Sequence, residues 1–201
     1  MKSQKIKKCN FSSFSLNEAY KEIGIENLVK WKPDFSPITP TNFFRESLKR
    51  LNVFDLRHTN AAKTLMINTF FIESLQLFTK LKAWRKMELE GEKVKGLTDY
   101  LLTNSYDYFD LPYFCIGVEA KKDDFEQGLA QCMVEMKSCK EANLKAGKDI
   151  DIYGIVTNGT TWEFYKYANN QVYFNRAYVS DDAENLVGML DYVFAECEKN
   201  I

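Results

Sequence analysis

Residues 114–122, Phe-Cys-Ile-Gly-Val-Glu-Ala-Lys-Lys, predict a β-strand, and so do residues 95–102, Lys-Gly-Leu-Thr-Asp-Tyr-Leu-Leu. Side chains alternate between the two faces of a strand, so Glu119 and Lys121 are expected to project side by side from one face. Residues 106–112 between the two runs are rich in Asp and Pro, which favour turns. The two strands are therefore expected to form a hairpin-like pair.

One acidic residue, Asp99, interrupts the apolar run of the first strand. Pairing of the two strands would bring Asp99 beside Glu119. Two carboxylates at one end of a sheet make a hard-oxygen site for a divalent ion such as Mg²⁺, and Lys121 could polarise or orient a water there. These residues indicate the chemistry of phosphodiester hydrolysis.

Four short motifs, in this order, resemble the PD-(D/E)XK nuclease superfamily. They are Gly96-x-x-Asp99-Tyr100, Glu119-Ala120-Lys121-Lys122, Gly128-Leu129-Ala130-Gln131 and residues 156–162. The chain is most similar, over about residues 61–167, to the restriction-endonuclease-like domain at the N-terminus of type I restriction motor subunits and to small stand-alone bacterial relatives. Thr98 stands where the superfamily name has proline, a position that varies widely.

The resemblance implies an α/β fold, a restriction-endonuclease-like mixed β-sheet flanked by helices, and Mg²⁺-dependent hydrolysis of DNA in restriction, defence or repair. It implies that Asp99 and Glu119 hold the metal, with a contribution from the Ala120 carbonyl, and that Mn²⁺ can replace Mg²⁺. Lys121 would stabilise the attacking hydroxide or the pentavalent charge. Gln131 would face the active site, the alternative being a surface glutamine. DNA is the implied partner, and a homodimer is left open.

Three other acidic residues are candidates for a further ligand. Many superfamily members present a third acidic residue from the helix before the first core strand, where Glu73 lies; the alternative is that Glu73 is at the solvent edge of its helix. Glu88 and Glu90 share one face of a strand expected over residues 82–92. Lys122 is a spare cation that would face away from Lys121.

The size of the chain bounds its organisation. At 201 residues, 45% of them hydrophobic, it is long enough for one well-buried core. We expect an N-terminal arm and helix over residues 1–40 and a restriction-endonuclease-like nuclease domain over residues 41–201. The boundary is an extended connector at residues 32–39, where prolines are concentrated.

Cysteine usage and hydropathy indicate the compartment. The five cysteines are an odd set without a C-x-x-C pair, and no signal peptide or bilayer-length apolar run of about 20 residues occurs. We expect a soluble cytoplasmic protein. The cysteines are scattered over predicted core elements, which argues against an iron–sulfur cluster.

Charge gives no general attraction to nucleic acid, because 27 Lys and Arg residues face 28 Asp and Glu residues for a net charge of −1. Phosphate contacts must come from local clusters, for each of which a solvated face is the alternative. Tyr165 or Tyr167 could stack a base if exposed. The candidate clusters are Lys2, Lys5, Lys7 and Lys8; Lys80, Lys82, Arg85 and Lys86; and Lys137, Lys140, Lys145 and Lys148.

Periodicity and capping residues predict the remaining elements. The first three strands are expected to form an antiparallel meander, followed by a helical crossover to a central strand and a hairpin at Asn158-Gly159. Residues 1–14 are expected to be loosely packed, and residues 25–31 to extend the first helix. We expect helices at 15–24, 41–51, 60–78, 125–144 and 183–198, and strands at 82–92, 95–102, 114–122, 151–157, 162–167 and 171–179.

Other chemistries find less support. No P-loop motif occurs, and the sole histidine, His58, cannot build a multi-histidine zinc site. Cys115 lies in an apolar strand and is expected to be an inert core thiol. Two rivals to a nuclease remain: a nuclease-like domain that binds nucleic acid or protein without turnover, and a structural domain with a solvated carboxylate pair.

Overall fold

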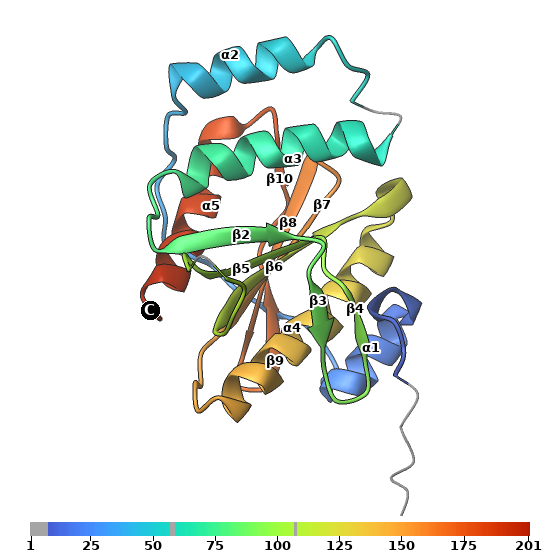
Figure 1. Ribbon diagram of the computed structural model, residues 1–201. Coiled ribbons are helices and arrows are strands. Elements are labelled where there is room, and N and C mark those ends of the chain that lie inside the picture. The colour runs from blue at the N-terminus through green and yellow to red at the C-terminus, as the bar shows by residue number, and fades with distance from the viewer. Residues whose placement is uncertain (1–7, 57–58, 107) are drawn as a thin grey trace, which may run out of the picture.

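The computed structural model of the chain describes residues 8–56, 59–106 and 108–201. A mixed β-sheet lies between two helical layers: α3 and α5 cover one face, α4 and α1 cover the other, and α2 lies outside α3 (Figure 1). The helices are α1 (Leu16–Ile23), α2 (Asn42–Leu51), α3 (Asn60–Leu75), α4 (Phe125–Lys145) and α5 (Ala183–Glu198), with 3-10 turns η1 (Phe11–Ser13) and η2 (Lys121–Asp123). The mixed α/β class predicted from the sequence is confirmed.

The main sheet has the strand order β1-β9-β8-β7-β6-β5-β2, with β10 paired to β8. Its strands are β1 (Val29–Lys30), β2 (Leu81–Arg85), β5 (Tyr100–Asn104), β6 (Tyr113–Glu119), β7 (Ile152–Thr157), β8 (Thr161–Ala168), β9 (Gln171–Phe174) and β10 (Tyr178–Val179). β5 and β6 are antiparallel, β6 and β7 are parallel through the α4 crossover, and β7 and β8 form a hairpin. These three predicted relationships are confirmed.

Two of the three strands expected in the antiparallel meander are not continuous. Lys86 has a φ of 54°, which a strand does not accommodate, so the expected strand over residues 82–92 divides into β2 and β3 (Glu88–Glu90). The strand expected over 95–102 also divides, into β4 (Lys95–Leu97) and β5. β3 and β4 pair with each other in a separate two-stranded sheet, while β5 pairs directly with β2.

Each face of the sheet has its own apolar core. On the α3 and α5 face, the ring of Phe71 lies 4.9 Å from that of Tyr100 and 5.8 Å from that of Phe194. On the α4 face, Val118 and Val156 of the sheet are fully buried in the same cluster as Met133 of the helix. The rings that could have stacked a base are not available for it: Tyr165 and Tyr167 are both buried.

Side-chain caps fix where the helices begin. Ser15 and Glu18 form a capping box before α1, and Thr41 Oγ1 accepts from the Phe44 amide at 3.2 Å at the start of α2. Asp124 caps α4 in the same way by accepting from the Gln127 amide at 2.9 Å. The bounds predicted for α5 are confirmed, and α3 ends three residues earlier than expected.

The N-terminal segment is packed where a loose arm was expected. Residues 1–7 lie outside the described part of the chain. The backbone of Cys9 pairs with that of Val94 in an isolated parallel β-bridge, and Phe11 is buried against the α4 face. The helical extension expected at residues 25–31 is also wrong. β1 instead adds parallel to β9, because the Trp31 ring packs against Tyr153 and its amide donates to the sheet.

Residues 32–39 run as irregular chain along α5 before reaching α2. The Ile38 amide donates to the Glu184 carbonyl at 3.0 Å. A Cβ on Gly188 of α5 would lie 2.4 Å from the Ser36 carbonyl oxygen, so this close approach requires glycine. The division of the chain at residue 40 stays a prediction. Within the described residues, no helix has the length and apolar character needed to cross a membrane.

Candidate functional site

Asp99 lies between β4 and β5 and is 3% exposed. Arg85 pairs with Tyr100 in the ladder between β2 and β5, so the next residues, Lys86 and Asp99, stand opposite each other. The ammonium of Lys86 forms an ion pair with the Asp99 carboxylate. Asp99 is thus a buried carboxylate whose charge is balanced by a side chain from the edge of the sheet, and that side chain is itself 54% exposed.

Two buried residues of α4 form a polar pair. Gln131 is buried, so the alternative of a surface glutamine is wrong, and its Nε2 donates a hydrogen bond of 2.8 Å to Oε1 of Glu135. Glu135 is fully buried, and its Oε2 has no hydrogen-bond partner among the described residues. A buried carboxyl with an unsatisfied oxygen is costly, which makes Glu135 an unusual component of a core helix.

Electrostatics connect these groups. The pKa of Glu135 is raised to about 8: burial is the main cause and the negative charge of Asp99 adds to it, while the Gln131 hydrogen bond and the positive charges of Lys86 and Lys121 act in the opposite direction. Each of the three charged residues is therefore near enough to Glu135 to affect its ionisation. We refer to Asp99, Gln131 and Glu135 as the carboxyl cluster.

The Glu-x-Lys motif lies at the end of β6 and the start of η2. β6 ends at Glu119; the side chains of Glu119 and Lys122 lie outside the described part of the structure. Ala120 is buried, and its amide donates to the Thr157 carbonyl at 2.7 Å. Lys121 is exposed and begins η2, so the expectation that the strand continues to residue 122 is wrong.

A polar latch explains why the chain leaves the strand here. Asp123 has a φ of 60°, and its Oδ1 lies 2.6 Å from Nζ of Lys63 in α3 and 2.7 Å from Nδ2 of Asn158. Hydrogen bonds from Lys63 and Asn158 lower the pKa of Asp123. Residues from α3 and from the turn between β7 and β8 therefore fix the position of η2, and with it the backbone of Lys121.

The cluster offers oxygen donors of the kind that Mg²⁺ prefers. Asp99 supplies one buried carboxylate, and Glu135 supplies an oxygen without a partner among the described residues. No group of three Cys, His, Asp or Glu side chains placed to hold a metal occurs within the described residues, a set from which the Glu119 side chain is missing. Because burial raises the pKa of Glu135 to about 8, a divalent ion here would depend on Asp99 together with ligands from the end of β6.

The other acidic candidates lie elsewhere. Glu73 is buried, so it does not lie at the solvent edge of α3, and it is not part of the carboxyl cluster. Its carboxylate accepts hydrogen bonds from the Thr41 amide at 2.6 Å and from the Thr41 hydroxyl at 2.8 Å, which holds the start of α2 on α3. Glu88 and Glu90 are exposed on β3, and Glu90 forms an ion pair of 2.7 Å with Lys8.

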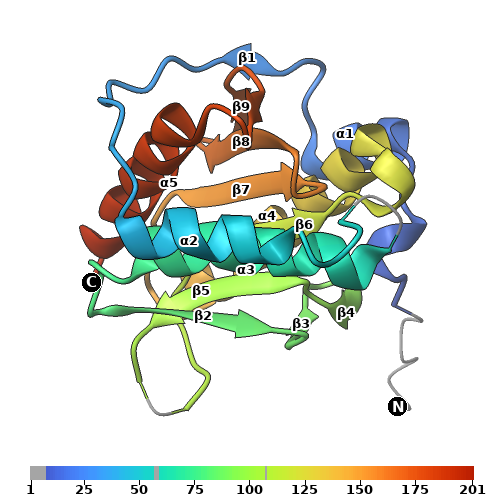
Figure 2. The same cartoon turned by 90° about the horizontal axis from the view of Figure 1, so that it is seen from above.

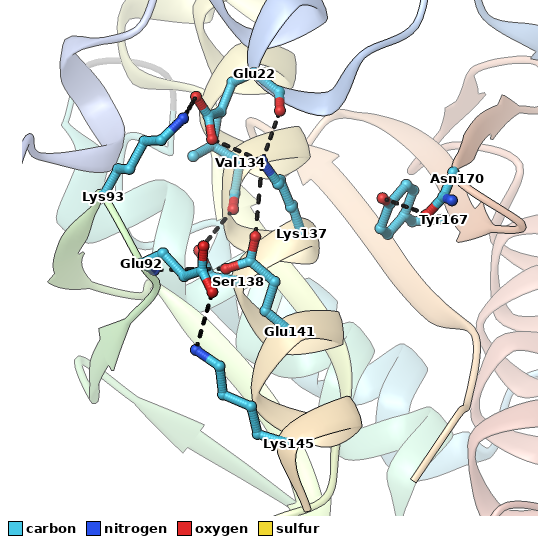
Figure 3. A network of polar contacts seen from close by, with 10 residues as sticks. All are labelled: Glu22, Glu92, Lys93, Val134, Lys137, Ser138, Glu141, Lys145, Tyr167 and Asn170. Carbon is cyan, nitrogen blue, oxygen red and sulfur yellow. Dashed lines mark hydrogen bonds and ion pairs between the residues drawn. The ribbon is translucent and has the colours of Figure 1, made fainter. Parts of the chain in front are cut away.

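Most of the third basic cluster is neutralised by carboxylates. Lys137 Nζ lies 2.6 Å from Glu22 of α1 and 3.7 Å from Glu141, and Lys145 Nζ lies 3.4 Å from Glu92. Figure 3 shows these ion pairs as dashed lines. Lys140 is paired in the same way, at 2.5 Å, with Asp149. These ion pairs join α1 and the loop between β3 and β4 to α4, and they leave little net charge for phosphate. Lys2, Lys5 and Lys7 lie outside the described residues.

The remaining candidates for chemistry are thiols and one histidine. All five cysteines are free, and burial raises the pKa of the Cys115 thiol well above its usual range, which agrees with an inert core residue. His58 lies outside the described residues.

Sequence reasoning missed Glu135, the pairing of Lys86 with Asp99, and the latch of Lys63 and Asp123. The spacing Gln131-x-x-x-Glu135 places the two side chains on one helical face and was a usable signal. The positions of Lys86 and Asp123 depend on positive φ values that the sequence does not indicate.

Comparison with known proteins adds no independent assignment. No protein-family model matches the sequence, and no curated protein is significantly similar to it. The function is therefore argued from the carboxyl cluster and the motifs that surround it.

Proposed function

We propose that this chain is a metal-dependent DNA nuclease with a restriction-endonuclease-like fold. One observation carries the proposal: the buried carboxylate of Asp99 and the ammonium of Lys121, in the Glu-x-Lys motif after β6, are both near enough to Glu135, the hydrogen-bond partner of Gln131 on α4, to affect its ionisation. Asp99 comes from the start of β5, and Gln131 and Glu135 come from the crossover helix. The proximity of these groups depends on how the chain folds and does not follow from strand alternation alone.

The topology supports the proposal. The chain runs through α3, then the antiparallel strands β2, β5 and β6, then the α4 crossover to the parallel strand β7. A mixed sheet with helices on both faces is what the resemblance to restriction-endonuclease-like domains implies. The β3–β4 hairpin is an insertion between β2 and β5 in this arrangement.

The proposed roles follow from position and charge. Asp99, Glu119 and the Ala120 carbonyl hold Mg²⁺ or Mn²⁺, which when bound stabilises charge on the phosphate and lowers the pKa of a water. Lys121, exposed in η2 beside the cluster, stabilises the developing negative charge of the phosphate. Gln131 orients Glu135 through their 2.8 Å hydrogen bond and so shapes the inner wall of the site.

Cleavage assays test the proposal directly. Supercoiled plasmid and circular single-stranded DNA are incubated with the protein in Mg²⁺, in Mn²⁺ and in EDTA. We expect cleavage of at least one substrate with metal and none in EDTA, and loss of cleavage in Asp99→Asn. Asp149→Asn, which changes a surface ion pair with Lys140, is the matched control. Absence of cleavage under all conditions, or full activity of Asp99→Asn, would overturn the proposal.

The ion pair between Lys86 and Asp99 favours a second candidate, a nuclease-like domain that binds nucleic acid without turnover. In this pair the Lys86 ammonium lies against the Asp99 carboxylate, where the metal ion is proposed to bind. Metal titration separates the two candidates. A nuclease takes up Mn²⁺ in an Asp99-dependent way, whereas a binding domain that keeps the ion pair is indifferent to Mn²⁺.

A further inference from the structure

β2 is the edge strand of the sheet, and one row of its side chains leads to the carboxyl cluster. Trp84 pairs with Leu101, which belongs to the core on the α4 face. Lys82 and Lys86 lie two positions to either side of Trp84, so Lys82 shares its face and Lys86 continues the row to Asp99. The order along this face is cation, aromatic ring, cation.

The cations of β2 lie over aromatic rings, unlike those of α4. Nζ of Lys82 is 4.9 Å from the centre of the Trp84 ring and 3.2 Å from the Tyr106 carbonyl oxygen. The guanidinium of Arg85 is 4.7 Å from the Tyr100 ring on the other face. In the part of the chain that the structure describes, neither Lys82 nor Arg85 forms an ion pair, so their charges remain available to an anion.

Exposed aromatic rings extend this surface. The loop between β5 and β6 projects beyond the β2 edge (Figure 2) and carries Tyr106 and Tyr108, which are 46% and 63% exposed. Their rings are stacked, with centroids 5.7 Å apart and an angle of 17°. Phe109 of the same loop packs edge-on against Trp84 at 5.7 Å, which joins the loop to the strand.

We propose that this surface, formed by Lys82, Trp84, Lys86, Tyr106 and Tyr108, binds single-stranded DNA and leads it to the carboxyl cluster. Aromatic rings stack on unpaired bases and lysines attract the backbone, the combination that single-strand-binding surfaces use. In a duplex the base faces are already stacked, so the rings have no partner there. The inference rests on the proposed nuclease function for the identity of its ligand and adds the strandedness of the substrate.

The contribution of the rings is measured by binding in EDTA. Fluorescence anisotropy of a fluorescein-labelled oligothymidylate of about 12 nucleotides, a length within the usual site size, compares the wild type with the double variant Tyr106→Ala/Tyr108→Ala. Loss of stacking is expected to weaken binding by about fivefold to a hundredfold. The control is Phe43→Ala, whose ring is 72% exposed on α2. This variant should bind the oligonucleotide as tightly as the wild type. Circular dichroism should show that both variants are folded.

The contribution of charge is measured by salt dependence. Lys82→Gln should reduce the slope of log K against log salt by about 0.7, the value for one phosphate contact with a single strand. Lys145→Gln, whose ammonium is paired with Glu92, should leave the slope unchanged. Equal affinity of the wild type for a duplex of the same length and sequence composition would overturn the inference. So would unaltered single-strand binding by both Tyr106→Ala/Tyr108→Ala and Lys82→Gln.

These experiments separate the inference from the proposed function. Binding is measured without metal, so it does not depend on cleavage. Single-strand binding that the tyrosine variant loses, in a protein that cuts no DNA with Mn²⁺, would refute the nuclease and support the binding surface. Metal-dependent cleavage with unaltered binding by the variants would support the nuclease and refute the surface.

Discussion

The side-chain amide of Gln131 donates a hydrogen bond of 2.8 Å to Oε1 of Glu135, one turn further along α4. This bond favours the ionised form of Glu135, but burial opposes it more strongly and raises the pKa to about 8 from an ordinary value of 4.5. The folded protein therefore holds a proton on Glu135 at neutral pH, whereas the unfolded chain does not.

This proton makes stability depend on pH. Between pH 4.5 and about 8 the folded state binds one more proton at Glu135 than the unfolded state, so this residue lowers the free energy of unfolding as pH rises. The change is at most about 1.4 kcal/mol per pH unit. Glu135→Gln, which is neutral at every pH, should match the wild type near pH 5 and exceed it near pH 8.

Urea unfolding followed by circular dichroism from pH 5 to pH 9 measures this difference. Glu126→Gln, on the exposed face of the first turn of the same helix, is the matched control. Parallel stability curves for wild type and Glu135→Gln would show that Glu135 is not held protonated in the folded protein.

Metal binding should be visible as stabilisation. At about ten times the dissociation constant, Mg²⁺ or Mn²⁺ should add about 1.4 kcal/mol to the free energy of unfolding of the wild type. Asp99→Asn keeps the size of the side chain but removes its charge, so its thermal melt should shift much less. Asp149→Asn should respond as the wild type does. An equal response of Asp99→Asn would remove Asp99 from the ligand set.

Lys121→Ala tests the cation at the phosphate. The side chain is exposed in η2, so its removal should change the melting temperature little, while cleavage should fall by about 100-fold or more. Lys122→Ala is expected to be close to neutral and serves as the neighbouring control. Equal cleavage by wild type and Lys121→Ala would contradict the role assigned to Lys121.

Val156→Asp tests the centre of the sheet. Val156 is fully buried in β7 between two paired strands, and an unpaired carboxylate there costs several kcal/mol against a total stability of about 5–15 kcal/mol. We expect no folded, soluble protein on expression. Val179→Asp, on β10 where the side chain is 46% exposed, should express normally. A folded Val156→Asp protein would contradict the strand order.

The parts of the fold that local patterns determine could be predicted from the sequence. The apolar stripe of α5, the Asp124 cap of α4 and the Asn158-Gly159 turn all act within a few residues, so composition and spacing indicate them. The crossover from β6 to β7 then follows, because parallel strands need a long connection. In the site, the burial of Gln131 excludes the surface alternative, and the expectation that it faces an active site stays a prediction.

The rest depends on contacts that spacing does not reveal. Lys86 and Asp123 adopt positive φ because ion pairs with Asp99 and Lys63 hold them there, and these partners are distant in sequence or in another element. Glu135 is fully buried in the folded chain, although spacing along α4 does not indicate this for a charged residue. Such burial is a tertiary property, and it overrides the local preference of a charged side chain.

The addition of β1 to β9 has a consequence for how the protein is made. Val29 and Lys30 pair with Tyr173 and Phe174, and Gln171 donates to the Asn27 carbonyl, so this segment leaves the ribosome well before its partners do. At about 5–20 residues per second, translation of the intervening chain takes on the order of 10 s. During that interval the Trp31 ring has neither Tyr153 nor Tyr192 to cover it. β1 can therefore join the sheet only after β9 has been synthesised.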